Sequence, residues 1–471
     1  MKQIIKTIAV LIIINYTLSA NIIDKTSNSV VKIFSTKLIP NYKYPWQTGK
    51  IARYTGSGAV ISNNRILTAA HVVSKSKLLE VTKENDTKKY IAHVQYISHQ
   101  ADLAILTVDN KSFFDNTKPL KLSTNIKIRD NVHVVGYPIG GKNISITTGV
   151  VSRIEQVYYS YSREKLLAIQ VDAAINSGNS GGPTVNDKNE LVGIAMMKRL
   201  NASNIAYIVP TDIINAFLVD VKDKKVDGFS QVDNSFEQIQ NETLKEYFNL
   251  KDNGVLITST DYNEKDLKVN DILIAIDNKL VSNTGTIKSK YGKIGLSHIV
   301  DTKQIGDIVK LDIIRDKKKI KIPYTVKNAK KLIEYEFDKA PRYIIFGGLI
   351  FTPITKNYLY KIPKTESSLI AKKLYKKKVT PEYKEAITII NTTFATEENR
   401  GYSTWANILK SVNGINIKSL NHLISILDTT KEKYTKFKFN DNSLIVLNTK
   451  KARESFDKIK NIYRLSSDRN N

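Results

Sequence analysis

Ser180 lies in the stretch GNSGGP, Gly178 to Pro183, between two apolar runs of the chain. The glycines on both sides of it let the backbone take angles that a side chain would forbid, and they let a substrate approach closely. Such a turn can present a serine hydroxyl as a nucleophile and aim the N–H groups of Gly178 and Ser180 at one point, as an oxyanion hole requires. A plain Gly-Ser turn has the same composition, so the chain must also supply a base and a carboxylate.

His71 and Asp102 are the candidates for these two roles. His71 lies in ILTAAHVV, at the end of an apolar run with small alanines before it, and Asp102, in ADLAIL, leads directly into an apolar segment. A buried acid is costly unless a partner such as an imidazolium pairs with it. If Asp102 is considered without the other two residues, it could equally be a turn acid that only caps a strand. The other histidines lie in polar, strand-like or later segments: His93, His99, His133, His298 and His422.

The order His71, Asp102, Ser180 along the chain is that of chymotrypsin-like barrels. GNSGG also fits the G-x-S-x-G pattern, but that elbow needs a strand-to-helix turn and a histidine after the acid. From Val30 to Val209 the sequence instead consists of short β-branched runs separated by Gly, Asn, Asp and Ser. This pattern is typical of an all-β barrel or sandwich. We therefore expect a mainly β domain over residues 21–222.

Pro210 to Val221, PTDIINAFLVDV, has helical apolar spacing with Thr211 as a possible cap, and we expect this helix to close the first domain. Two smaller units follow at residues 228–327 and 340–471. In each of them an apolar strand precedes a second strand that ends in a polar turn. We expect both to be α+β domains.

Length and composition set the limits of this interpretation. A chain of 471 residues is long enough for about three domains. Lys and Arg exceed Asp and Glu by 72 − 45 = 27, but the lysines are scattered with few aromatic residues between them, which indicates a solubilising surface rather than a nucleic-acid site. The absence of cysteine excludes disulfides and thiol chemistry, and no His/Cys/Asp cluster has metal-ligand spacing. We expect no cofactor and no metal.

Residues 1–20 are predicted to be a signal peptide. Lys2 and Lys6 precede an apolar run from Ile8 to Ile14, and Leu18 to Ala20 form a small-residue cleavage site. The apolar run is much shorter than the roughly 20 residues that span a bilayer, so we expect no obligate membrane anchor. A periplasmic location is expected, with secretion from the cell as the alternative.

Three motifs, TAAHVV, ADLAIL and DAAINSGNSGGP, together resemble the HtrA/Deg family of serine endopeptidases. The segments VVGYPIGG, TTGVVSRIE and YIIFGGLIFTPIT extend the likeness to the plant and bacterial Deg branch with two PDZ domains. The resemblance implies that His71 is the general base, Asp102 its orienting carboxylate and Ser180 the nucleophile. It also implies an oxyanion hole from the Gly178 and Ser180 amides. The fold that it implies for residues 21–222 is a chymotrypsin-like double β-barrel with the site between the barrels.

The same resemblance implies further properties. The substrate pocket should suit small aliphatic residues, with Ile175 as one wall, and trimers or multiples of trimers should form. Residues 228–327 and 340–471 should both be PDZ-like domains. One departure is Asn270, because Asn270-Asp271 stands where the family usually has Gly-Asp. The aromatic stretch YKYPWQ, Tyr42 to Gln47, is expected to pack either between subunits or on its own barrel.

The sequence therefore predicts a serine endopeptidase that cleaves unfolded or misfolded proteins outside the cytoplasm. Two alternatives stay open at this stage. One is a chaperone or adaptor that binds unfolded chains without cutting them. The other is a secreted protease that acts on host proteins.

Overall fold

The computed structural model describes residues 26–470 except for Asn85, Gly140, Lys142, Lys378, Thr392 and the segments 199–204, 231–233, 251–252, 261–263, 329–330, 375–376 and 403–406. The predicted signal peptide, residues 1–20, lies outside this description. None of the described helices is long and apolar enough to span a membrane. The chain forms two compact units, one of residues up to Lys37 with Arg53–Ala329, the other of Leu38–Ala52 with Lys330–Asn471. Each is described by itself.

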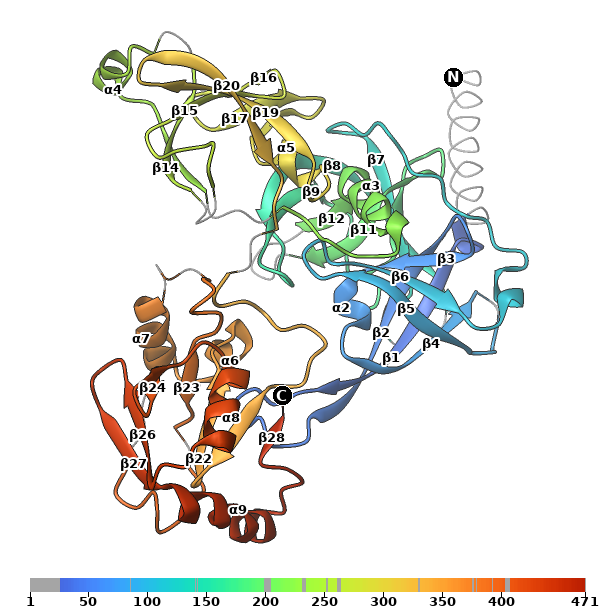
Figure 1. Cartoon of the computed structure of the whole chain (residues 1–471). Coiled ribbons are helices and arrows are strands. Elements are labelled where there is room, and N and C mark those ends of the chain that lie inside the picture. The colour runs from blue at the N-terminus through green and yellow to red at the C-terminus, as the bar shows by residue number, and fades with distance from the viewer. Residues whose placement is uncertain are drawn as a thin grey trace, which may run out of the picture. The chain divides into compact units, whose positions relative to one another are not determined.

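The first unit contains two closed six-stranded barrels (Figure 1). The first barrel has the strand order β1-β2-β3-β6-β5-β4, with bounds β1 Val30–Ile39, β2 Lys50–Ile61, β3 Arg65–Thr68, β4 Ser76–Lys83, β5 Tyr90–Ser98 and β6 Leu103–Val108. The second has the order β10-β11-β12-β9-β8-β7, with bounds β7 Asn131–Gly136, β8 Ser145–Tyr158, β9 Lys165–Val171, β10 Pro183–Val185, β11 Leu191–Lys198 and β12 Ala206–Pro210. Neighbouring strands pair antiparallel in both barrels. The predicted double barrel is confirmed.

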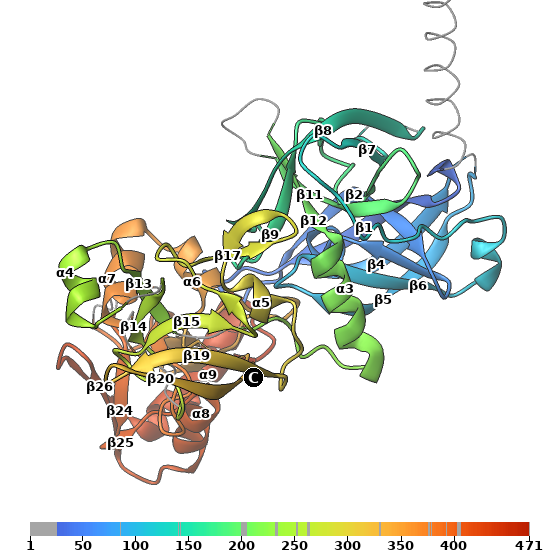
Figure 2. The ribbon, with the colours of Figure 1, turned by 90° about the horizontal axis from the view of Figure 1, so that it is seen from above.

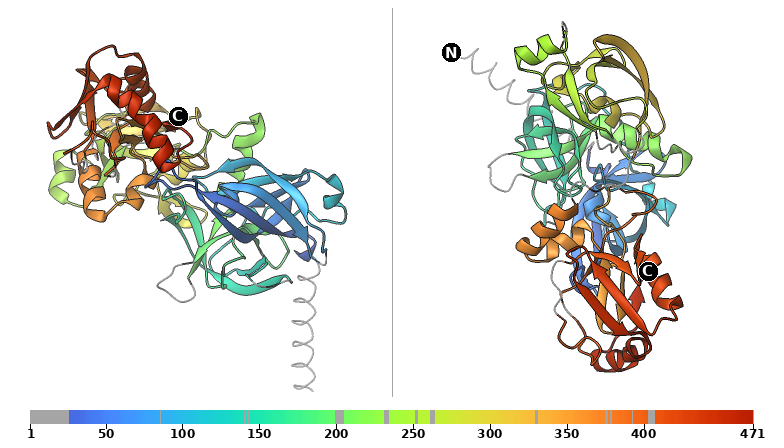
Figure 3. Two further views of the ribbon diagram at one scale, coloured as in Figure 1. Left: turned by 90° about the horizontal axis from the view of Figure 1, so that it is seen from below. Right: turned by 60° about the vertical axis from the view of Figure 1, so that its left-hand side comes forward.

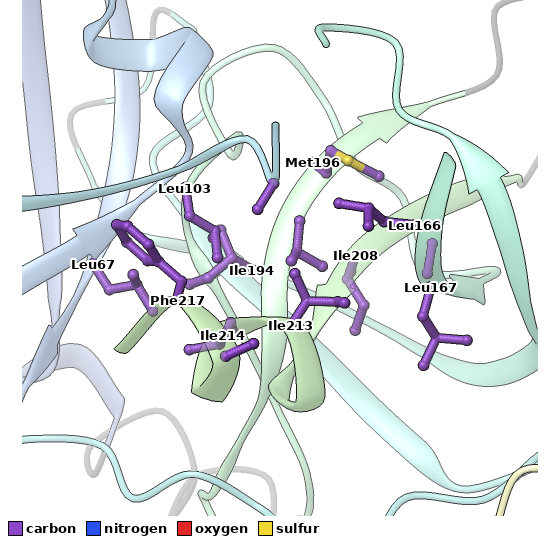
Figure 4. Close-up of a cluster of buried hydrophobic side chains, with 14 of the residues drawn as sticks. Leu67, Leu103, Leu166, Leu167, Ile194, Met196, Ile208, Ile213, Ile214 and Phe217 are labelled. Carbon is purple, nitrogen blue, oxygen red and sulfur yellow. The ribbon is translucent and has the colours of Figure 1, made fainter. Parts of the chain in front are cut away.

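Helix α3, Thr211–Asp220, follows the second barrel and contacts β11 and β12 (Figure 2). Its apolar face carries Ile213, Ile214 and Phe217, all fully buried. Figure 4 shows these side chains in one cluster with Leu67 and Leu103 of the first barrel and with Ile194 and Ile208 of the second. The helix therefore joins the cores of the two barrels.

One detail of the predicted helix was wrong. Thr211 is the first helical residue and not the cap, because Pro210 occupies the N-cap position and offers no side-chain hydrogen bond there.

The described barrel region also contains three short helices: the one-turn helix α2, Ala70–Val73, and the 3-10 helices Lys111–Phe114 and Val221–Asp223.

The rest of the first unit is an α+β region after residue 228. Strands β13, β14, β15, β19 and β20 form a sheet in that order, β16 pairs with β15, and β17 pairs with β18. The bounds are β13 Ser235–Gln238, α4 Glu242–Tyr247, β14 Val255–Ser259, β15 Ile272–Ile276, β16 Lys279–Leu280, β17 Thr286–Ser289, β18 Gly292–Gly295, α5 His298–Asp301, β19 Ile308–Arg315 and β20 Lys318–Thr325. Asn270 has a φ of 72°, a conformation that asparagine tolerates, which explains how it can stand in the place of glycine.

Polar contacts join this region to the second barrel. Gln156 of β8 donates from Nε2 to Ser297 Oγ at 2.8 Å and to Asp301 Oδ2 at 3.0 Å. Asp212 of α3 accepts from Lys290 Nζ at 2.8 Å and from the Tyr291 hydroxyl at 3.0 Å. Burial opposes ionisation of Asp212, but the interaction with His298 and the hydrogen bonds from Lys290 and Tyr291 hold its pKa down, at about 2.

The C-terminal part of the second unit, orange and red in Figure 3, contains two four-stranded sheets and their helices. The sheet orders are β23-β22-β21-β28 and β25-β24-β26-β27. The bounds are β21 Tyr343–Phe346, β22 Leu349–Pro353, α6 Lys356–Lys361, α7 Lys364–Leu374, β23 Ile387–Ile389, β24 Leu409–Val412, β25 Ile415–Asn416, α8 Leu420–Thr429, β26 Tyr434–Phe439, β27 Leu444–Asn448, α9 Thr449–Tyr463 and β28 Arg469–Asn470.

The aromatic segment between β1 and β2 belongs to this second unit. The Trp46 ring lies 5.1 Å from the ring of Phe394, edge on, and the Tyr42 hydroxyl donates to the carbonyls of Glu336 at 2.9 Å and Lys339 at 3.1 Å. The sequence analysis expected packing between subunits or on the segment's own barrel. Neither describes these contacts, which are made with a C-terminal unit of the same chain that lies almost 300 residues away in sequence.

Candidate active site

His71 and Asp102 are in direct contact in the first barrel. His71 Nδ1 lies 2.7 Å from Asp102 Oδ2, and the His71 backbone N–H donates to Asp102 Oδ1 at 2.8 Å. The Asp102 side chain is only 1% exposed, whereas that of His71 is 28% exposed. A buried carboxylate therefore holds one ring nitrogen, while solvent and substrate can reach the imidazole.

Local backbone geometry brings the two residues together. β3 pairs with β6, with Thr68 opposite Ala104, so the residues after β3 meet those before β6. The amide of Ala70 donates to the Asp102 carbonyl at 3.0 Å, and Asp102 takes a left-handed φ of 54°, which short polar side chains accept more readily than most. This turn of the backbone directs the carboxylate at α2.

The Ser180 loop packs against the same end of the first barrel. The Ser57 amide donates to the Ser180 carbonyl at 2.9 Å. A Cβ on Gly181 would come within 2.2 Å of Thr68 Oγ1 and 3.0 Å of the Ala69 amide nitrogen, so this residue must be glycine for the loop to approach β3 so closely. Ser180 therefore lies beside the segment that leads to His71.

The Ser180 hydroxyl makes no hydrogen bond to the His71 ring within the described part of the chain. In structures without substrate, hydrogen bonds between a nucleophile and its base are often long and tighten only in the complex. The structure thus brings His71 and Asp102 into contact and places the Ser180 backbone nearby, without a direct link between Ser180 and His71.

The predicted oxyanion donors lie in a constrained turn. Gly178 has a φ of 103°, and a Cβ there would lie 2.4 Å from the Tyr137 carbonyl oxygen. The Asn179 amide donates back to the Asn176 carbonyl at 3.0 Å, whereas the amides of Gly178 and Ser180 donate to no other described residue. Two N–H groups of this loop are thus available for an incoming oxyanion.

Ser57 is a site residue that the sequence analysis missed. It is fully buried, and its hydroxyl donates to the Gly178 carbonyl and accepts from the Tyr137 amide, both at 2.8 Å. It therefore fixes the peptide next to Gly178, one of the two predicted oxyanion donors. Ser57 and Gly178 lie 121 residues apart in the sequence, so no local pattern could pair them.

Ile175 is buried, with 4% of its surface exposed, in the core cluster of the barrels. It lies immediately before the nucleophile loop. Its role as a wall of the substrate pocket stays a prediction.

Three other histidines have carboxylate neighbours. His298 Nε2 lies 3.7 Å from Asp212 Oδ2. His93 pairs with Asp109 and His133 with Asp187, each at 2.9 Å, but these carboxylates are 63% and 50% exposed. A solvated carboxylate orients a ring poorly because water competes for it. Asp102 is more deeply buried than the other three carboxylates and lies closer to its histidine, at 2.7 Å, which favours His71 as the base.

Tyrosines surround the His71–Asp102 pair. Burial, with a further contribution from the Asp102 charge, raises the pKa of Tyr159 well above its ordinary value. The ring of Tyr161 lies 6.1 Å from the His71 ring, and its hydroxyl lies 2.9 Å from His99 Nδ1.

Across the described residues, no group of three or more metal-ligating side chains could hold a metal ion.

Comparisons with known proteins agree with this architecture. A family model described as a trypsin-like peptidase domain matches residues 56–194, and one described as a PDZ domain matches residues 333–471. Protease Do-like 4, mitochondrial, of Arabidopsis thaliana is 36% identical over 457 residues, which cover 94% of this chain and 85% of that protein. Putative protease Do-like 3, mitochondrial, of the same plant is 35% identical over 452 residues, 94% of this chain and 79% of that protein.

Among solved structures, the HtrA-type protease AlgW with tripeptide has a TM-score of 0.52 and 20% identity, covering 65% of this chain and 96% of that one. At this identity the likeness concerns the fold alone. The predicted fold class, a chymotrypsin-like double barrel followed by PDZ-type α+β domains, is confirmed. The exact domain boundaries stay predictions.

Proposed function

The chain belongs to the HtrA/Deg family of serine endopeptidases, and we propose that His71, Asp102 and Ser180 form its catalytic triad. The observation that carries this proposal is the buried Asp102 carboxylate, 2.7 Å from His71 Nδ1, at the end of the barrel against which the Ser180 loop packs. The proposal gives each of the three residues one chemical role.

In this mechanism Ser180 Oγ attacks the scissile carbonyl carbon while His71 Nε2 takes the hydroxyl proton. The developing oxyanion is bound by the amides of Gly178 and Ser180. His71 then gives the proton to the leaving amine, and an acyl-enzyme remains on Ser180. Water, deprotonated by His71, releases the acyl group and restores the serine. Asp102 stays ionised and holds the tautomer in which Nε2 is free to accept.

Ser180→Ala tests this assignment directly. We expect cleavage of a denatured protein such as casein to fall by on the order of 10⁶-fold, as for other serine triads. Ser152→Ala, a change of an exposed serine on β8, is the control and should cleave normally. Normal casein cleavage by Ser180→Ala would remove Ser180 from the mechanism.

Protein substrates follow from the family, and we propose that the substrates of this chain are unfolded or misfolded proteins outside the cytoplasm. The predicted signal peptide supports export, although two relatives are named mitochondrial. Fractionation of cells that express the full chain distinguishes the cases. Enzyme in a periplasmic or secreted fraction supports export, whereas enzyme inside the cell or an organelle contradicts it.

We further propose that residues 228–327 form a PDZ-like domain in addition to the one over 333–471, and that the chain assembles as trimers or multiples of trimers. The sheet of β13, β14, β15, β19 and β20 supports the first point. Light scattering on the purified chain tests the second. A monomeric mass at micromolar concentration would contradict it.

A further inference from the structure

The inner face of β1 changes from apolar to polar along the strand. Val31 and Ile33 are fully buried in the core of the first barrel. The next residues on that face, Ser35 and Lys37, are also buried, with 1% and 7% of their surfaces exposed. A buried ammonium group is costly unless acceptors surround it. The Lys37 ammonium group therefore needs an acceptor close to it.

Lys37 contacts the backbone of the proposed general base. Its Nζ donates to the carbonyl oxygen of His71 at 2.6 Å. The residues are 34 positions apart in the sequence. On its other side the ammonium lies 5.0 Å from the centre of the Tyr54 ring on β2, within the range of a cation–π contact. The ammonium thus bridges the barrel wall and α2.

The His71 carbonyl needs such a donor because of the length of α2. The last four carbonyls of a helix have no partner within it, and α2 consists of one turn only. The Ala70 carbonyl accepts from the Ser74 amide at 2.8 Å. The Val73 carbonyl accepts from Ser76 Oγ at 2.5 Å.

Ser76 in turn leads back to β1, because its Oγ lies 2.6 Å from that of Ser35. Both polar residues on the inner face of β1, Ser35 and Lys37, therefore reach a carbonyl of α2, one through Ser76 and one directly. A helix of four residues has little stability of its own. Its position depends on the burial of its apolar side chains, on these hydrogen bonds and on the Asp102 side chain.

We infer that Lys37 is a positioning residue for His71, which it holds in place through the His71 carbonyl oxygen. The inference rests on the proposed role of His71 as the general base. Asp102 fixes the ring and the amide of His71, and Lys37 fixes its carbonyl, so that both ends of the residue are held. A displacement of a catalytic group by about 1 Å can cost about 10²-fold in rate.

Lys37→Met tests the inference, because methionine keeps most of the apolar stem and removes the donor. With a fluorogenic peptide substrate we expect kcat to fall about 10-fold to 100-fold and KM to stay within about 2-fold. The rate of fluorophosphonate labelling should fall by a similar factor. Lys37→Arg, which keeps a cationic donor, should recover part of the lost kcat.

Lys83→Met is the matched control. Lys83 lies on β4 of the same barrel, and its ammonium likewise donates to a backbone carbonyl, that of Asp115 at 3.3 Å, and lies 5.4 Å from the Phe113 ring. Neither Asp115 nor Phe113 belongs to α2. We expect the kcat of Lys83→Met to equal that of the wild type. Equal losses of kcat in Lys83→Met and Lys37→Met would reduce the role of Lys37 to general stability and contradict the inference.

Two further results separate the possible failures. If Lys37→Met has the kcat of the wild type while Ser180→Ala is inactive, the role of Lys37 is contradicted and the triad stands. If Ser180→Ala is active, the triad itself is contradicted. If Lys37→Met does not fold, Lys37→Gln, with a shorter and neutral donor, decides: a reduced kcat at unchanged KM supports the inference, and a wild-type kcat contradicts it.

Discussion

At the scale of single residues, the proposed peptide hydrolysis depends on how the Asp102 carboxylate is placed against His71. Its carboxylate accepts both the ring N–H and the backbone N–H of the same residue, His71, at 2.7 and 2.8 Å. One oxygen therefore orients the ring and the other fixes the backbone that carries it. With Lys37 on the His71 carbonyl, the base is held at three points.

Asp102→Asn should separate these functions. The amide can keep the geometry, but its NH₂ group favours the tautomer in which Nε2 carries the proton and cannot accept one. We expect kcat to fall about 10⁴-fold at neutral pH with little change in KM. Steady-state kinetics on a peptide substrate measure both constants. A loss of less than 10-fold would show that Asp102 does not control the tautomer.

Gly178→Ala should damage the oxyanion turn. The added Cβ meets the Tyr137 carbonyl oxygen at 2.4 Å, and φ is 103°, so the turn must move. We expect a loss of about 10²-fold or more in kcat, comparable with the loss of an oxyanion donor. Gly292→Ala is the control, since Gly292 has a φ of 87° but no atom within 4 Å of its Cβ position. Unchanged kcat in Gly178→Ala would contradict the assigned role.

At the scale of elements, α3 joins the cores of the two barrels. Phe217 is fully buried, and it clusters with Leu67 of β3 and Ile194 of β11 (Figure 4). β3 leads into α2 and His71, and β11 anchors the Ser180 loop through the Gly181 amide, which donates to the Ala195 carbonyl at 2.8 Å. The packing of α3 therefore supports both halves of the site.

Phe217→Ala removes this packing. We expect the free energy of unfolding to fall by about 3–5 kcal/mol, as for other buried phenylalanines. Val219→Ala, on the exposed side of the same helix, should cost less than about 1 kcal/mol. Urea unfolding followed by fluorescence compares the two variants. Equal losses would show that α3 does not depend on its buried face.

Asp301 of α5 gives the contact between the second barrel and the region after residue 228 a dependence on pH. Burial raises the pKa of its carboxyl to about 8, although hydrogen bonds from Ser297 and Gln156 act in the opposite direction. Because its pKa is raised, the Asp301 carboxyl stays protonated to a higher pH in the folded state than in the unfolded state. The stability that the protonated carboxyl contributes is fully present below about pH 4 and is lost as the pH rises through about 8.

Asp301→Asn removes the titrating group and keeps an oxygen that accepts from Gln156. We expect the melting temperature of the wild type to fall, relative to that of Asp301→Asn, between about pH 4 and pH 8 and to level off above. Thermal unfolding across this range measures the difference. A difference that does not change with pH would place the Asp301 pKa near its ordinary value.

At the scale of the whole molecule, the chain crosses between its two units more than once. β1 begins in the first unit, the segment Leu38–Ala52 belongs to the second, and the chain returns to the first at Arg53. Lys37, which contacts His71, is the residue immediately before this segment. Neither unit is therefore a contiguous piece of sequence.

Trp46→Ala tests the attachment of this segment. Trp46 packs between Tyr44 and Phe394, at 5.5 and 5.1 Å between ring centres. Its removal should increase hydrogen exchange in residues 38–52 and around Phe394, because those backbone groups lose their packing. The core strands of the barrels should keep their protection. Unchanged exchange in the segment would show that Trp46 does not anchor it.

The sequence predicted the two barrels well because each strand carries its own local signal of alternating or β-branched residues. The run RILTAA, Arg65 to Ala70, fits a single short strand by its sequence. In the structure β3 ends at Thr68, and the helix α2 begins at Ala70 and is too short to show a helical period. Ser57 and Lys37 escaped notice for another reason. Their partners, Gly178 and His71, are 121 and 34 residues away and are chosen by the folded backbone.

The central claim, that His71 and Asp102 make the Ser180 hydroxyl an unusually strong nucleophile, is tested most directly by a fluorophosphonate probe, with the labelled residue identified by mass spectrometry. We predict a single adduct on Ser180 in the native wild-type chain, none in Ser180→Ala, and much slower labelling after heat denaturation. An adduct on another serine, or equal labelling of the native and denatured chains, would contradict the claim.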